Sequence, residues 1–101
     1  MEDPLARQRA IVAQYPDNEL AHFSLGKALY DRGEWAEARE HLTAALAKRK
    51  DWMVVQILLG KIEMQTGNPS GAREAFLAAR QLAIEQNHEG PLAELQELLS
   101  A

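Results

Sequence analysis

The chain has 101 residues, of which 47% are hydrophobic, and its 11 basic and 15 acidic residues give a formal net charge of −4. This length fits one small domain, and the acidic balance argues against sequence-independent binding of nucleic acid, which needs clustered positive charge. Cysteine is absent, so disulfides, thiol nucleophiles and thiolate metal ligands are excluded. No apolar run approaches the length of a membrane span, and the first residues do not resemble a signal peptide, so we expect a soluble, cytoplasmic protein.

The first three predicted helices cover residues 4–14, 19–32 and 35–49. Asp3 is the expected N-cap of the first helix, with Pro4 at its first helical position. Asp17 or Asn18 is expected to cap the second helix. Gly33 follows that helix, where a residue in the left-handed conformation commonly ends a helix.

The next three predicted helices cover residues 52–66, 69–86 and 91–100. Asp51 is the expected N-cap of the fourth helix, and Gly67 is expected to end it. Asn68 and Pro69 are expected to start the fifth helix as its N-cap and first helical residue. The sixth helix carries four leucines on one face, and we expect it to cover the apolar edge of the preceding repeat as a cap.

Ten residues recur at one fixed offset of 34, whereas chance would give about three such matches. The first members of these pairs are Asp17, Leu25, Gly26, Lys27, Gly33, Ala38, Arg39, Glu40, Ala44 and Ala45. A fixed period of this length indicates one helical unit that is repeated and stacked. We therefore predict a single domain with an N-terminal helix (1–16), repeat one (17–50), repeat two (51–86) and a C-terminal capping helix (87–101).

The residues of each copy resemble the tetratricopeptide repeat (TPR). The first copy reads His22-x-x-Leu25-Gly26-x-x-Leu29, then Ala38-x-x-x-Leu42 and Ala45. The second copy reads Gln56-x-x-Leu59-Gly60-x-x-Glu63, then Ala72-x-x-x-Phe76 and Ala79. The family's usual Trp is replaced by His22 and Gln56, and its usual Tyr by Leu29 and Glu63. The resemblance implies an all-α fold, an α-α superhelix of two helical hairpins with a helix packed at each end.

Small residues at matching positions predict a close contact between the two helices of each hairpin. Glycine in the middle of a helix costs up to about 1 kcal/mol relative to alanine, so its recurrence suggests that the helices approach closely there. The signature residues that form this seam are Leu25, Gly26, Ala38, Leu42, Ala45, Leu59, Gly60, Ala72, Phe76 and Ala79.

The first helix of each hairpin, the A helix, carries a second stripe of residues away from the seam. In the family these positions line a concave groove that holds a peptide. The partner-binding residues implied here are Leu20, Phe23, Lys27, Tyr30, Asp31, Val54, Ile57, Lys61, Met64 and Gln65. Phe23, Tyr30 and Ile57 would be the anchors. Lys27 and Lys61 either meet a ligand carboxylate or pair with Asp31 or another nearby acid.

Residues that could support catalysis are scarce. His22, His41 and His88 lie on separate elements and form no metal-binding helix motif, and no nucleophile elbow or phosphate loop is present. We therefore expect no catalytic site, no metal and no cofactor.

The predicted function is non-catalytic binding of a peptide or partner helix in the groove. The alternative is a structural module that closes a homodimer through the same apolar surface, and the terminal helices could also cover that surface. The expected partner is a protein or peptide, and neither nucleic acid nor membrane.

Overall fold

In the computed structural model, which describes residues 3–100, these residues form six helices and no strand. Met1, Glu2 and Ala101, the ends of the predicted terminal segments, lie outside this range. The helices belong to two compact units that divide between Lys50 and Asp51, and each unit is described by itself. The first unit contains α1 (Ala6–Gln14), α2 (Glu19–Asp31) and α3 (Trp35–Lys48), and the second contains α4 (Met53–Gln65), α5 (Pro69–Gln86) and α6 (Glu89–Ser100).

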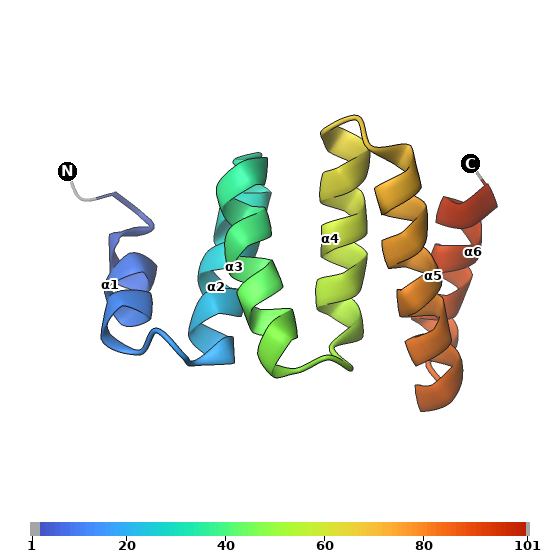
Figure 1. Ribbon diagram of the computed structural model, residues 1–101, viewed down its shortest axis with the longest axis horizontal. Coiled ribbons are helices and arrows are strands. Elements are labelled where there is room, and N and C mark those ends of the chain that lie inside the picture. Colours follow the sequence, from blue (N-terminus) through green and yellow to red (C-terminus); the bar gives the residue numbers. More distant parts are fainter. Residues whose placement is uncertain (1–2, 101) are drawn as a thin grey trace. The chain divides into compact units, whose positions relative to one another are not determined.

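In the first unit, α2 and α3 form an antiparallel hairpin, and α1 packs on α2 (Figure 1). Asn18 caps α2, because its side-chain oxygen accepts a hydrogen bond of 3.0 Å from the Ala21 amide. Gly33 has a φ of 74°, which explains why glycine stands where the chain turns toward α3. The predicted cap and stop of this helix are therefore confirmed.

The seam of this hairpin has the predicted composition. Leu25, Ala38, Leu42 and Ala45 are buried, and Leu29 is buried with them. A Cβ atom placed on Gly26 would lie only 2.8 Å from Leu42 Cγ, so the two helices can approach this closely only because Gly26 has no side chain.

The prediction for the start of α1 was wrong by two residues. The helix begins at Ala6, with Leu5 at the N-cap position. Asp3 instead accepts a 2.9 Å hydrogen bond from the Leu5 amide in the preceding turn, so its side chain holds a turn that includes Pro4. This turn directs the Leu5 side chain inward, where it is buried, whereas α1 itself buries no residue.

In the second unit, α4 and α5 form the second antiparallel hairpin (Figure 1). The predicted start of α5 is confirmed: Asn68 accepts a 3.1 Å hydrogen bond from the Gly71 amide, and Pro69 occupies the first turn. The predicted cap of α4 was wrong, because Trp52 occupies the N-cap position and makes no side-chain cap bond.

The second hairpin differs from the first at the signature position Leu59 and at Glu63. Gly60, Ala72, Phe76 and Ala79 are buried as predicted, but Leu59 is only half-buried. Glu63, where the family carries an aromatic residue, accepts a 2.8 Å hydrogen bond from the Asn68 side chain. A polar residue is tolerated at this position because the end of the helix supplies a partner for its carboxylate.

The last helix, α6, packs along α5 (Figure 1). It begins at Glu89, two residues before the predicted start, because Asn87 alone takes the left-handed conformation (φ of 57°) and reverses the chain quickly. Leu95 of α6 is buried in one core cluster with Met53, Ile57 and Phe76. Leu82, Leu92, Leu98 and Leu99 pack against that cluster, so α6 is an integral part of the second unit.

Candidate partner-binding surface

The predicted stripe on α2 is accessible to different degrees along the helix. Leu20 at the start of the helix is 58% exposed, and Asp31 at its end is exposed. Phe23, Lys27 and Tyr30 between them are half-buried. Tyr30 makes an edge-to-face contact with Trp35, with ring centroids 5.4 Å apart, so part of its ring is used within the unit.

The predicted lysines have acidic partners within their own units. Lys27 Nζ lies 2.7 Å from Asp31 Oδ1, one helical turn along α2. Lys61 Nζ lies 3.1 Å from Glu94 Oε1, which belongs to α6. The sequence left open whether these lysines meet a ligand carboxylate or a nearby acid of the chain. In this structure each lysine pairs with a nearby acid.

On α4 the stripe is divided between the core and the surface. Val54 and Met64 are 48% and 47% exposed, and Gln65 is exposed as well. Ile57 is only 8% exposed, because it lies in the core cluster with Leu95 of α6. Ile57 therefore contributes mainly to the stability of the second unit in this structure.

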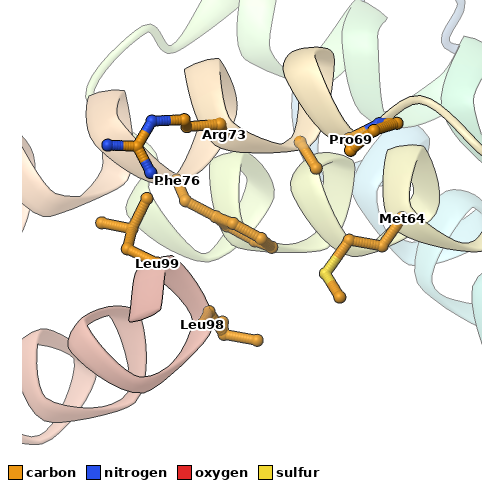
Figure 2. Close-up of a pocket in the computed structure, with 7 residues that line it drawn as sticks. Met64, Pro69, Arg73, Phe76, Leu98 and Leu99 are labelled. Atoms are coloured by element: carbon orange, nitrogen blue, oxygen red, sulfur yellow. The ribbon is translucent and has the colours of Figure 1, made fainter. Parts of the chain in front are cut away.

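Two hollows lie in the second unit, and the Lys61–Glu94 ion pair lines one of them. One has a volume of about 410 Å³ and is lined by Val54, Ile57, Leu58, Lys61, Gly90, Pro91 and Glu94. The other has a volume of about 310 Å³ and is lined by Met64, Pro69, Ala72, Arg73, Phe76, Leu98 and Leu99. Figure 2 shows the second hollow, where Met64 and Pro69 face Leu98 and Leu99 across the Phe76 ring. Both hollows lie beside an exposed residue of the predicted stripe, Val54 in one case and Met64 in the other.

Arg73 is the cation in the wall of the second hollow. Within residues 3–100 its guanidinium forms no hydrogen bond or ion pair, unlike Lys27 and Lys61. Nothing in the sequence singled out Arg73 as a site residue, because its recurrence as Arg39 and Arg73 is also explained by surface ion pairs.

The first unit contains a polar cluster that sequence reasoning missed. The Nδ1 atoms of His22 on α2 and His41 on α3 lie 3.0 Å apart. Glu37 on α3 accepts hydrogen bonds from both terminal nitrogens of Arg9 on α1. The signal that could have found the histidine pair is that both residues lie within about three helical turns of the α2–α3 connection, on antiparallel helices.

The electrostatics of this cluster follow from its contacts. Burial lowers the pKa of His41, and the neighbouring His22 lowers it further. The hydrogen bond from Arg9 lowers the pKa of Glu37. A hydrogen bond from the Leu5 amide lowers the pKa of Asp3, with smaller contributions from Arg32 and Arg9.

Side chains that could form a metal site do not cluster in the described residues. Across the described range, 3–100, no set of three or more His, Cys, Asp or Glu side chains is placed to hold a metal ion. His88 is exposed at the start of the α6 segment, away from the other two histidines in sequence.

Comparison with known proteins agrees with the helical-hairpin architecture. The family model described as "Tetratricopeptide repeat" matches residues 19–52, which comprise α2, α3 and the connection to α4. The TPR repeat-containing protein PA0015 of Pseudomonas aeruginosa is 35% identical over 66 residues, which are 65% of this chain and 63% of that protein. Residues 19–52 therefore correspond to a tetratricopeptide repeat.

A solved structure is similar to this chain over nearly its whole length. The solution structure of protein BPP2914 from Bordetella parapertussis has a TM-score of 0.84 and 32% sequence identity, covering 99% of this chain and 87% of that one. The match to the Pseudomonas relative, by contrast, spans less than two thirds of that protein's length. TPR repeats generally mediate interactions between proteins and are generally not catalytic. Among the described residues of this chain, no helix is long and apolar enough to cross a membrane.

Proposed function

We propose that this protein binds a segment of a partner protein, without catalysis, through the exposed stripe residues of its A helices, α2 and α4. The single observation that carries the proposal is the pair Leu20 and Val54. These apolar residues stand at the same position of the two repeats and are 58% and 48% exposed, whereas other apolar side chains of the same helices are buried in cores. Exposure of large apolar residues at a repeated position is typical of an interaction surface.

The hollow beside Met64 in the second unit supports a proposal for the chemistry of the partner segment. The hollow beside Met64 has apolar walls from Phe76, Leu98 and Leu99, so it fits a bulky apolar side chain (Figure 2). Arg73 supplies a positive charge in the same wall. We therefore expect a partner segment with a large aliphatic or aromatic residue next to an acidic residue, because a carboxylate is the natural counterpart of a guanidinium.

The test starts from peptides selected from a random displayed library against the full chain, whose affinities are then measured by fluorescence anisotropy. Val54→Ser and Met64→Ser should each weaken binding by about tenfold, the factor expected when roughly 1.4 kcal/mol of apolar contact is lost. Both residues are largely exposed, so the folded state should be retained. Arg73→Gln should weaken the binding of peptides with an acidic residue more than the binding of the same peptides with Asn or Gln in its place.

Ile84→Ser is the matched control, because Ile84 is 50% exposed but lies on α5, outside the stripe and the hollow of Figure 2. Equal loss of affinity in Ile84→Ser and Val54→Ser would contradict the proposed surface. The homodimer alternative is tested by sedimentation of the free protein. A dimer that dissociates in Leu20→Ser/Val54→Ser would favour self-association through the same residues.

A further inference from the structure

The histidine pair of the first unit has the geometry of a hydrogen bond between two rings. The Nδ1 atoms of His22 and His41 are 3.0 Å apart, the ring centroids are 5.3 Å apart, and the ring planes differ by 26°. The centroids are therefore separated along the line of the two nitrogens, as expected when one ring N–H points at the other ring's lone pair. Such a contact needs one nitrogen as donor and the other as acceptor.

The contact of His22 Nε2 determines which ring donates the hydrogen bond between the two Nδ1 atoms. His22 Nε2 lies 2.6 Å from the carbonyl oxygen of Pro16, and a carbonyl can only accept, so this nitrogen carries the hydrogen. In neutral His22 the Nδ1 atom is then the acceptor, and His41 Nδ1 donates to it. His41 Nε2 faces Glu37 Oε2 at 4.0 Å.

The pair lies between two polar contacts that involve α1 and the α1–α2 connection. His22 holds the Pro16 carbonyl in the α1–α2 connection, and Glu37, beside His41, holds Arg9 of α1. Because α1 buries no side chain of its own, its attachment depends on these polar contacts and on Leu5.

We propose that the His22–His41 pair is a pH-sensitive latch that releases α1 and the α1–α2 connection when both rings are protonated. Two imidazolium rings present N–H groups to one another at 3.0 Å, so the hydrogen bond is lost and two positive charges face each other. The other charged groups around the pair are Glu37 and Glu40 on α3 and Arg9 on α1, with Asp3 next to Arg9. The negative charge of Glu37 does not fully compensate the second positive charge of the pair, because Arg9 already donates hydrogen bonds to both carboxylate oxygens of Glu37.

The direction of the effect follows from linkage. Burial and His22 lower the pKa of His41 in the folded protein, so the unfolded chain binds the proton more readily. The stabilising contribution is therefore present above the ordinary histidine pKa of about 6.5 and is lost as the pH falls through the lowered value.

The second unit provides an internal control. The residues 34 positions after His22 and His41 are Gln56 and Ala75, which cannot titrate in this range. The same helical hairpin without the pair is thus present in the same chain, and acidification should leave α4 and α5 unchanged while α1 responds.

The test is an NMR titration of the full chain from about pH 7.5 to about pH 5, which follows the three histidine rings and the backbone amides. We expect the α1 amides to respond as the pH falls through the lowered pKa of His41, where the pair loses its hydrogen bond. Across that step, the ratio of docked to undocked α1 should fall roughly tenfold, the factor for one lost hydrogen bond.

His41→Asn is the decisive variant, because its side-chain amide nitrogen lies at about the place of the imidazole Nδ1, so it can still donate to His22 Nδ1 but does not titrate. It should remove the response of α1, and His88→Gln should leave the response intact. The latch is refuted if α1 amides of the wild type stay unchanged when both rings are protonated. This wild-type observation does not depend on how any variant folds.

Discussion

Gly26 and Gly60 set how closely the helices of each hairpin approach. A Cβ atom on Gly60 would lie 2.4 Å from Phe76 Cε1 and 2.6 Å from Phe76 Cδ1, and on Gly26 it would meet Leu42 at 2.8 Å. The buried side chain of the facing helix thus occupies the space that any other residue would need. The glycines are kept for this contact, although glycine weakens a helix.

Gly60→Ala is predicted to destabilise the second unit by about 1–3 kcal/mol, the usual range for an overpacked core. The gain in helix propensity, about 1 kcal/mol, does not offset the displacement of the Phe76 ring. Urea denaturation followed by tryptophan fluorescence measures the change. Gly90→Ala in α6 is the control, because a Cβ there meets nothing within 4 Å, and it should stabilise or leave stability unchanged.

A second change separates overpacking from other causes. In Gly60→Ala/Phe76→Leu the smaller side chain makes room for the new methyl group, so part of the lost stability should return relative to Phe76→Leu alone. If the two substitutions add without any coupling, the close contact at Gly60 is not the reason for the loss.

At the scale of elements, α1 and α6 attach to their hairpins in different ways. Leu95 places α6 in the core of the second unit, together with Ile57 and Phe76. The α1 segment is attached by Leu5, which is 4% exposed and precedes the helix, and by the Arg9–Glu37 ion pair. Exposed ion pairs contribute about 1 kcal/mol or less, so Leu5 should contribute most of the attachment.

Leu5→Ala is predicted to release α1 from the hairpin, since removing a buried leucine side chain costs about 2–5 kcal/mol. Trypsin cleavage after Arg7 and Arg9 reports the release, because cleavage requires an undocked segment. Ile11→Ala is the control: Ile11 lies on α1 but is 40% exposed, so its truncation should change cleavage little. Equal cleavage rates in Leu5→Ala and the wild type would show that other contacts hold the helix.

At the scale of the molecule, the groups with shifted pKa values among residues 3–100 all lie in the first unit: Asp3, Arg9, Glu37 and His41. The lowered pKa values of Asp3 and Glu37 mean that their contribution to stability is present above their ordinary values, 3.8 and 4.5, and is lost as the pH falls through the lowered ones. The stabilising contribution linked to His41 is lost in a higher pH range, which begins below about pH 6.5.

The first unit should therefore lose stability on acidification in two separate ranges, one below about pH 6.5 and one below about pH 4. Trp35 reports on the first unit and Trp52 on the second, so Trp52→Phe and Trp35→Phe variants isolate the two signals. The urea midpoint measured by Trp35 fluorescence should fall in both ranges. Glu37→Gln should reduce the fall of this midpoint in the lower pH range. An unchanged fall in that variant would show that Glu37 does not contribute to it.

The sequence alone determined the repeated helical hairpin and its seam. The 34-residue offset, the capping residues Asn18 and Asn68, and the small residues opposite Leu42 and Phe76 are local signals, because each depends on spacing within one repeat. Periodicity and capping therefore predicted the repeated helical hairpin before any contact was known, and the resemblance to the tetratricopeptide repeat implied the TPR fold. Two predicted helix starts were wrong: the Asp3 side chain is engaged in the turn before α1, and Asp51 stands one residue before the N-cap position of α4.

Only the tertiary structure decided which stripe residues remain exposed and which polar groups meet. Ile57 is buried because α6 covers it, and Lys61 is paired because Glu94 lies across from it. His22 and His41 face one another through the packing of α2 on α3, and Arg9 reaches Glu37 only when α1 docks. Contacts of this kind depend on helix rotation and register between segments far apart in the chain, which no periodic pattern within one segment specifies.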